Sequence, residues 1–307
     1  MLSPSRELLI CAPERWDESC FSVPAVRALA ASGLGIGVLC KPHQKVFWET
    51  LPGLEVITPQ TLSEQWKVAL LWEPGDLAKL VRRAGIHKRI GPSVGKLHKQ
   101  LTEQLKGRPH VTEHRVQFYL KAVAEMGVPT TKPEFFEPAG LDVTQGQDSI
   151  LLVPDSDFGS SHEWSLQNWQ VLADKLKESH SLAIARLEGG RNLGEQLADY
   201  LGDKVPTAMI SLQEPPLDLI ASQPTVIAAD GSVPHIASHL GSSCITLFGP
   251  NDSTWKRPLG KRHRVARHHV ECAPCFAPCC PLDMRCQKEL EVAEVIAGLK
   301  ALTFSRS

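Results

Sequence analysis

Short apolar runs alternate with helix-like segments along most of the chain, and this alternation limits the possible folds more than any other feature. In the first half, the runs with the length of buried strands lie at residues 8–12, 35–40, 54–57 and 68–71. Helical patterns lie between them at 24–31 and 46–51, and Pro24 suits the first turn of its helix. Strands and helices that alternate at this spacing predict a parallel sheet connected by crossover helices.

The same alternation returns in the second half. Predicted strands lie at 150–153, 182–185, 208–210, 225–229 and 244–248, and helical patterns separate them at 166–177, 193–201, 217–221 and 234–240. Residues 128–148 hold several prolines and show little periodicity, as expected of a linker. We therefore predict an α/β protein of two successive Rossmann-like domains, residues 1–145 and 146–307.

The overall charge of the chain is balanced. Its 33 Lys and Arg residues nearly match its 34 Asp and Glu residues, so net charge does not indicate a nucleic-acid partner. The charges are unevenly distributed, because residues 79–115 contain ten Lys and Arg but only two Glu. This segment interrupts the strand–helix alternation. It is either a solvated basic face or a surface for an anionic ligand or membrane headgroups.

Two features bear on the cellular compartment. No run of eighteen apolar residues predicts a membrane-spanning helix, and the first apolar run, 8–12, is too short for a secretory signal. Five of the nine cysteines lie within 272–286, and this odd count and clustering make a poor disulfide framework. We therefore expect a cytoplasmic protein whose cysteines are thiols or metal ligands.

Four of the clustered cysteines could close a tetrahedral zinc site: Cys272, Cys275, Cys280 and Cys286. The first pair has the usual Cys-x2-Cys spacing, but five residues separate the second pair, which is not a standard arrangement. A thiol-rich or disulfide-linked structural loop explains the same cluster. Both interpretations stay open at the level of the sequence.

Ligands of parallel sheets bind beyond the carboxyl ends of the strands, so the loops after the predicted strands are the places to look for chemistry. The loop after the first strand leads to Asp17 and Glu18. These adjacent carboxylates could supply a general base, or could favour a helix N-terminus through its dipole.

Two loops of the second half have the composition of anion sites. A glycine, two serines and a histidine at 159–162 could cradle a phosphate through backbone N–H groups, although a capping loop with Ser165 as N-cap explains them equally well. After the strand at 225–229, the Gly231–Ser232 turn precedes a helix and could hold another anion. His235, on the first turn of that helix, either contacts a ligand or has a structural role.

Taken together, these motifs resemble glycosyltransferase family 9, the lipopolysaccharide heptosyltransferases, and most closely the ADP-heptose:lipopolysaccharide heptosyltransferase II branch. The similarity runs over nearly the whole chain. The matching segments are 24–29 (the helix after the family's Gly-Asp pair), 83–91 (a basic acceptor-side segment), 158–165 (the donor loop), 230–235 (the Asp-Ser/Thr-Gly-x-x-His motif) and 247–250. The cysteine-rich tail follows these segments in the family's order and is the most specific feature.

The chain also departs from the family pattern. Glu18 stands where the family has its catalytic Asp, and it reaches about one methylene further. His162 replaces a donor-phosphate Lys, and histidine is mostly neutral at cytoplasmic pH. Glu163 stands where Arg is frequent and would repel a diphosphate if it faced inward, while Gly231 and Ser232 invert the usual hydroxyl-then-glycine order. These differences imply another nucleotide-sugar, weak activity or a loss of catalysis.

The resemblance implies a GT-B fold, in which two Rossmann-like domains face an interdomain cleft, with the acceptor on the N-terminal side and the donor on the C-terminal side. It also implies an inverting, metal-independent transfer of a heptose or related sugar from an ADP-sugar to the inner core of lipopolysaccharide, with no cofactor. The expected partners are a nucleotide-sugar and an anionic lipid-linked saccharide, met at the inner face of the cytoplasmic membrane by a peripheral protein. No nucleic-acid partner is expected.

The resemblance also implies roles for individual residues. Glu18 would be the base, with Asp17 as the alternative. The donor would contact Ser160, Ser161, His162, Glu195, Asp230, Gly231, Ser232 and His235, with Asp230 at the sugar and Glu195 at the ribose. The acceptor would contact Arg82, Arg83, Lys88 and Arg89. The competing hypothesis is a catalytically inactive GT-B paralogue that acts as a binding or assembly protein, and a cytosolic zinc protein is a third.

Overall fold

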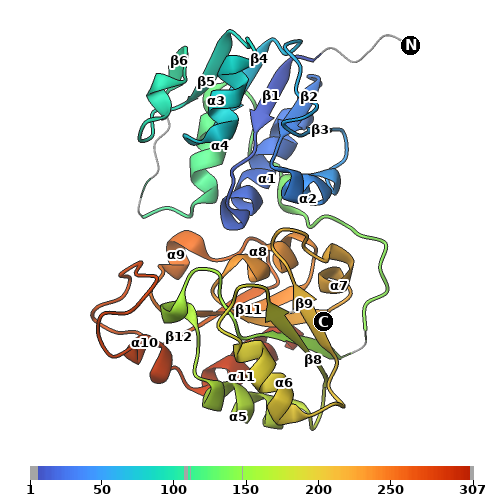
Figure 1. Cartoon of the computed structure of the whole chain (residues 1–307), viewed down its shortest axis with the longest axis vertical. Coiled ribbons are helices and arrows are strands. Elements are labelled where there is room, and N and C mark those ends of the chain that lie inside the picture. Colours follow the sequence, from blue (N-terminus) through green and yellow to red (C-terminus); the bar gives the residue numbers. More distant parts are fainter. Residues whose placement is uncertain (1–5, 107–109, 111, 147, 305–307) are drawn as a thin grey trace. The chain divides into compact units, whose positions relative to one another are not determined.

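The computed structural model describes residues 6–106, 110, 112–146 and 148–304. The chain divides into two compact units, Met1–Glu137 and Pro138–Ser307, each built around one sheet (Figure 1). The predicted boundary after residue 145, and the assignment of acceptor and donor sides to the two halves, stay predictions. No helix among the described residues is long and apolar enough to cross a membrane.

In unit 1, the described residues form a sheet of six parallel strands in the order β3-β2-β1-β4-β5-β6, which is the order of a Rossmann fold. The strands are β1 (Leu8–Cys11), β2 (Ile36–Leu39), β3 (Glu55–Ile57), β4 (Val68–Leu71), β5 (Lys88–Pro92) and β6 (Glu103–Leu105). The helices are α1 (Trp16–Ala30), α2 (Lys45–Glu49), α3 (Asp76–Arg83) and α4 (Val116–Glu125). The strands at 8–11 and 68–71 pair with each other, so the two central strands of the sheet come from apolar runs of the sequence.

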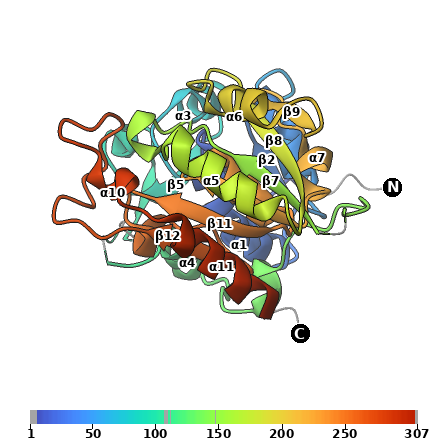
Figure 2. The ribbon, with the colours of Figure 1, turned by 90° about the horizontal axis from the view of Figure 1, so that it is seen from below.

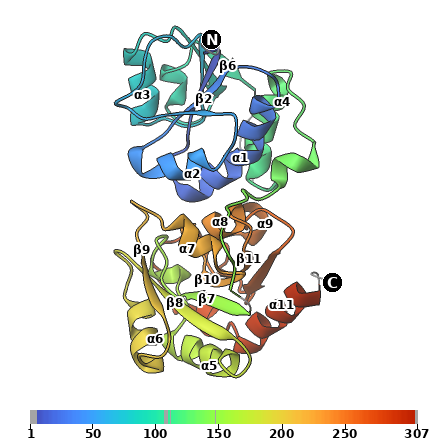
Figure 3. The ribbon, with the colours of Figure 1, turned by 90° about the vertical axis from the view of Figure 1, so that its right-hand side faces the viewer.

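The helices of unit 1 cover both faces of its sheet (Figure 3). Leu77, Ala78 and Val81 of α3 recur at helical spacing and pack against buried side chains of β1 and β4. On the other face, α1 packs against α4, and nearly every residue of α1 is buried. A helix buried on all sides lacks a polar face, which explains why its first half has no clear amphipathic pattern in the sequence.

Two sequence-based predictions for unit 1 were wrong. Helix α1 begins at Trp16, well before the predicted start, and Pro24 lies inside it rather than in its first turn. The basic segment 79–115 does not interrupt the alternation, because it contains the end of α3 and strands β5 and β6. Strand β5 begins with Lys88 and Arg89 and ends in Gly-Pro, so it has too few apolar residues to be read as a strand.

In unit 2, the described residues again form six parallel strands, in the order β12-β11-β10-β7-β8-β9. The strands are β7 (Ser149–Val153), β8 (Ser181–Leu187), β9 (Thr207–Ile210), β10 (Thr225–Ala229), β11 (Ser243–Phe248) and β12 (His263–Arg267). The helices are α5 (Leu166–Leu176), α6 (Leu193–Leu201), α7 (Leu217–Ala221), α8 (Ser232–His239), α9 (Ser253–Lys256), α10 (Arg285–Lys288) and α11 (Val292–Phe304). Read from β9 to β12, this is the same Rossmann order as in unit 1.

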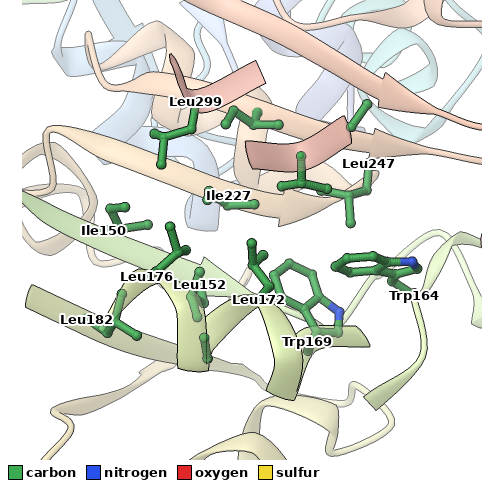
Figure 4. Close-up of a cluster of buried hydrophobic side chains, with 14 of the residues drawn as sticks. Ile150, Leu152, Trp164, Trp169, Leu172, Leu176, Leu182, Ile227, Leu247 and Leu299 are labelled. Carbon is green, nitrogen blue, oxygen red and sulfur yellow. The ribbon is translucent and has the colours of Figure 1, made fainter. Parts of the chain in front are cut away.

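Helices α5, α6 and α11 cover one face of this sheet, and α5 and α11 lie side by side (Figure 2). The core on this face is drawn in Figure 4, where Ile150 and Leu152, alternate residues of β7, lie in one cluster with side chains of α5 such as Leu172. Trp164 and Trp169 pack edge to face, with ring centroids 5.5 Å apart, and the Trp164 indole N–H donates to the Leu290 carbonyl oxygen at 3.0 Å. The other face of the sheet packs against α8.

Candidate functional site

The strand order reverses at one point in each sheet, between β1 and β4 in unit 1 and between β7 and β10 in unit 2. The loops that leave adjacent strands in opposite directions open a crevice there, and ligands of doubly wound sheets bind in it. The loops after β1, β7 and β10 are those that the sequence singled out. No prediction from the sequence covers the loop after β4.

In unit 1, Glu18 lies on the first turn of α1 and is held from α4. The Arg115 guanidinium Nε lies 3.0 and 2.7 Å from the two carboxylate oxygens, and the Tyr119 hydroxyl donates to Oε2 at 2.5 Å. Burial, together with the charge of Glu18, raises the pKa of Tyr119 well above its usual value, so the phenol stays protonated and donates. The hydrogen bonds from Arg115 and Tyr119 connect α1 to α4. They also orient the Glu18 carboxylate, which was predicted to be the base.

Asp17, the alternative base, has a side chain that is fully buried. Both of its oxygens accept hydrogen bonds at 3.0 Å from the guanidinium of Arg15. A general base must be reached by the hydroxyl that it deprotonates. The side chain of Glu18, which is 9% exposed, meets this requirement better than that of Asp17.

Glu73, two residues after β4, is a candidate that the sequence analysis missed. Its Oε1 accepts a hydrogen bond from the Glu14 backbone N–H at 2.8 Å, and both residues line a small cavity at the point where the strand order reverses. Burial raises the pKa of Glu73, and the negative charges of Glu18 and Glu14 raise it further. A carboxyl group with a raised pKa holds its proton more tightly than an ordinary glutamate does, which suits a group that transfers protons. An acid two residues after an apolar strand was the signal that could have found it.

In unit 2, Asp230 follows β10 and is fully buried. One of its oxygens, Oδ2, lies 3.0 Å from His162 Nδ1 and accepts a hydrogen bond from Asn251 Nδ2 at 2.7 Å. The histidine must carry a proton on Nδ1 to donate to this carboxylate. The other oxygen, Oδ1, has no hydrogen-bond partner among the described residues. A buried carboxylate oxygen without a partner calls for a donor, such as a ligand hydroxyl.

The Gly231–Ser232 turn, predicted to hold an anion, already contacts a carboxylate of the protein. Asp157 accepts a hydrogen bond from the Ser232 backbone N–H at 2.7 Å and another from its hydroxyl at 2.6 Å. A Cβ atom on Gly231 would lie 2.8 Å from Asp157 Oδ1, so a larger residue there would displace this carboxylate. Pro234 has no N–H to offer, and the N-terminus of α8 therefore has less capacity for a phosphate than its sequence suggested.

Glu163 lies where a family arginine was expected, and its side chain is buried. Burial raises its pKa to about 7, although Oε1 lies 3.3 Å from the Ser156 backbone N–H and Oε2 lies 3.5 Å from Arg191 Nη1. Near pH 7 this carboxyl is therefore neutral for part of the time. Glu163 would therefore repel a diphosphate less strongly than a permanently charged glutamate would.

The other predicted donor residues lie on separate elements. Ser160, Ser161 and His162 form a 3-10 turn, and Ser161 is bound to the cysteine-rich segment, since its hydroxyl donates to the Ala277 carbonyl and its N–H lies 3.2 Å from the Pro278 oxygen. Ser165 caps α5 by accepting from the Asn168 N–H, which confirms its predicted capping role. His235 is buried on the first turn of α8. Glu195 is half exposed on α6 and lies 3.7 Å from Arg186 Nη1.

The four basic residues predicted to meet an acceptor have different surroundings. Arg82 and Arg83 are exposed on the last turn of α3. Lys88 lies 3.2 Å from Glu103 Oε2, in an ion pair between β5 and β6. The guanidinium of Arg89 donates to the carbonyl oxygens of Gln100 (2.6 Å), Ile86 (2.7 Å) and His87 (3.0 Å), so it supports the local backbone.

All nine cysteines are free thiols in the structure. Cys286 is buried, and its pKa is raised by this burial and by the nearby Cys272, Cys280 and Cys275. Within the ranges that the structure describes, no three His, Cys, Asp or Glu side chains are grouped as metal ligands.

A family model shows which family the chain belongs to, and the similar solved structures show its fold. Residues 60–285 match the model of glycosyltransferase family 9 (heptosyltransferase). Similar solved structures include the E. coli ADP-heptose LPS heptosyltransferase II (16% identity, 98% of this chain and 99% of that chain, TM-score 0.78) and the family 9 glycosyl transferase from Veillonella parvula (12%, 99% and 99%, TM-score 0.79). A third is the E. coli heptosyltransferase WaaC with ADP (13%, 96% and 99%, TM-score 0.74). A search of curated proteins gives no significant match. The structural matches confirm the predicted fold class, α/β with two Rossmann-like halves of the GT-B type.

Proposed function

Since the chain belongs to glycosyltransferase family 9, the heptosyltransferases, we propose that it moves a heptose or related sugar from an ADP-sugar to the inner core of lipopolysaccharide. The proposed transfer inverts the anomeric centre and needs no metal. The acceptor is an anionic lipid-linked saccharide, which the protein would meet at the inner face of the cytoplasmic membrane as a peripheral protein. The ADP bound to the similar WaaC supports the choice of nucleotide.

The observation that carries the donor part of this proposal is Asp230. Its buried Oδ1 has no partner among the described residues, while His162 and Asn251 fix Oδ2. A carboxylate held in this way is ready to accept a hydrogen bond from a sugar hydroxyl without reorganising. The serines at 160 and 161, the Gly231–Ser232 turn and His235 would lie toward the diphosphate, and Glu195 toward the ribose.

The chemical step requires a base in unit 1. Glu18 takes the proton from the acceptor hydroxyl, the freed oxygen attacks the anomeric carbon, and the bond from that carbon to the diphosphate breaks with its electron pair on the leaving group. A single displacement of this kind inverts the anomeric centre. Arg115 and Tyr119 hold the Glu18 carboxylate in place, and Glu73 is the alternative base.

A second candidate function is a catalytically inactive binding or assembly protein on the same scaffold. The observation that favours it is the carboxylate of Asp157 on the Ser232 turn, where a donor phosphate would otherwise accept the same hydrogen bonds. On this hypothesis the chain binds no nucleotide-sugar.

Calorimetric titration of the Asp230→Asn variant tests the proposal. The amide oxygen preserves the bonds to His162 and Asn251, and the amide nitrogen replaces the acceptor Oδ1 with a donor. We expect the Kd for ADP-heptose to rise about tenfold or more. The Kd for ADP, which lacks the sugar, should not change. Equal loss of both affinities would place Asp230 away from the sugar, and no binding of any nucleotide-sugar by the unmodified protein would favour the inactive paralogue.

A further inference from the structure

The cysteine-rich segment between β12 and α10, residues 268–284, contacts one of the loops that we propose for the donor. All of these residues are described and form neither helix nor strand, and Figure 2 shows them projecting beside α10. The Ser161 hydroxyl donates to the Ala277 carbonyl oxygen, and the Ser161 N–H donates to the Pro278 oxygen at 3.2 Å. A Cβ atom on Gly159 would lie 2.2 Å from that Pro278 oxygen, so the two loops are in close contact.

The same segment contacts a second loop of the candidate site, the loop that follows β11. The backbone N–H groups of Cys275 and Phe276 both donate to the Pro250 carbonyl oxygen, at 3.0 and 2.9 Å. The side chain of the next residue, Asn251, donates to Asp230 Oδ2 at 2.7 Å. Residues 275–278 therefore contact both of the loops whose side chains bind the buried Asp230.

Two cysteines at the start of this contact are exposed thiols, Cys272 and Cys275. Their Cys-x2-Cys spacing is that of dithiol centres that exchange with disulfides. The charges of both act on the thiol of Cys286, so the two lie close to the same third sulfur. Cys286 itself is buried, and burial raises its pKa, so it stays a thiol and reacts poorly. The accessible pair is therefore Cys272 and Cys275.

We infer that Cys272 and Cys275 form a disulfide by exchange with a small-molecule disulfide such as oxidised glutathione, and that this bond tightens donor binding; the second part rests on the proposed function. The thiolate of one cysteine attacks a sulfur of the glutathione disulfide and releases one glutathione. The thiolate of the other cysteine then attacks the protein sulfur of the mixed disulfide and releases the second glutathione. The two cysteine protons pass through solvent to the two glutathione thiolates, so one disulfide is reduced as one forms.

The new bond would act on the donor through residues 275–278. It closes immediately before these residues, in a segment without regular secondary structure, and a closed loop has fewer conformations. Loops that are already held in the bound geometry lose less conformational entropy when a ligand binds. The two loops beside Asp230 would then need less ordering, so the oxidised protein should bind the donor more tightly than the reduced protein.

The first test is mass spectrometry of the full chain after equilibration in reducing and oxidising glutathione buffers. We expect oxidation to remove two hydrogens from the unmodified protein by forming one internal disulfide. Cys272→Ser and Cys275→Ser should each lack this bond and carry one glutathione more than the unmodified protein, because the second thiol is absent. The matched control is Cys279→Ser, an exposed cysteine of the same segment, and it should still form the disulfide. No internal disulfide in the unmodified protein, or one that persists in Cys272→Ser, would overturn the inference.

The second test is calorimetric titration of both redox forms with ADP-heptose. We expect the Kd of the oxidised protein to be about threefold lower than that of the reduced protein, with the same difference in Cys279→Ser and none in Cys272→Ser. Equal Kd values for the two forms of the unmodified protein would overturn the link to the donor. A protein that forms the disulfide but binds no ADP-heptose in either form would refute the proposed function and leave the disulfide as assigned. Sugar transfer by a protein that forms no disulfide would refute this inference alone.

Discussion

The carboxylate of Glu18 has two possible roles, as a proton acceptor and as the ion-pair partner of Arg115. The sequence places Glu18 near the start of a predicted helix. Arg115 and Tyr119 are about a hundred positions away from it, and no local sequence pattern connects them to it. For the same reason the contact of Asp157 with Ser232 could not be predicted. Residue types at loop positions were predictable, whereas their partners depend on how the sheet brings distant loops together.

Glu18→Gln removes both the proton acceptor and the charge that pairs with Arg115, and it keeps the shape of the side chain. Glutamine can still accept the hydrogen bonds of Arg115 and Tyr119, but it cannot take a proton, so we expect kcat to fall by about 10²–10⁴-fold while the Kd for the donor stays nearly unchanged. Tyr119→Phe is the control, because it removes one hydrogen bond and keeps the base. Full activity of the Gln variant would exclude Glu18 as the base, and a loss of activity in Glu73→Gln would then identify the alternative.

Glu163 predicts a pH dependence of stability. Its pKa in the folded chain is about 7, above the 4.5 of an ordinary glutamate, because the side chain is buried. The folded state therefore binds this proton more tightly than the unfolded state does. The resulting stabilisation is complete below pH 4.5 and is lost as the pH rises through 7.

Melting temperatures from about pH 5 to about pH 8 measure this loss. We expect the decline across the range to be smaller in Glu163→Gln than in the unmodified protein. The exposed Glu195→Gln is the matched control and should retain the decline. Identical slopes in all three proteins would show that Glu163 ionises normally.

At the scale of the elements, strands with continuous apolar runs were predictable and polar strands were not. Strand β4 and helices α6 and α7 have the predicted bounds, and β10 does as well. The sequence analysis missed β5, β6 and β12, because two of them lie at the edges of their sheets, where burial is incomplete and charged side chains are tolerated. The start of α1 was missed because burial on all sides removes helical periodicity.

The buried face of helix α5 predicts how two neighbouring substitutions change the free energy of unfolding. Leu172 is fully buried in the core of unit 2 (Figure 4), and Leu172→Ala should lower the free energy of unfolding by about 2–5 kcal/mol through lost burial and a residual cavity. Its neighbour Val171 is 40% exposed, so Val171→Ala should cost far less. Denaturant titration of both variants checks this, and equal losses would contradict the assignment of the buried face of α5.

For the molecule as a whole, the sequence predicted two Rossmann-like halves, and both sheets have the strand order of a Rossmann fold. The family assignment is confirmed by the match over residues 60–285. The interdomain cleft, the acceptor and the inverting course stay predictions. These three features depend on the substrates and on contacts between loops that are far apart in the sequence. Neither apolar periodicity nor motif spacing encodes such contacts.

The proposed function is the transfer of a sugar from an ADP-sugar to an inner-core acceptor. Mass spectrometry of the reaction of the purified protein with ADP-heptose and an inner-core acceptor that lacks the heptose tests this proposal. We expect one added heptose per acceptor and an equal amount of released ADP, with both lost in Glu18→Gln. An acceptor that stays unmodified with every ADP-sugar supplied, although the protein is folded, would contradict it.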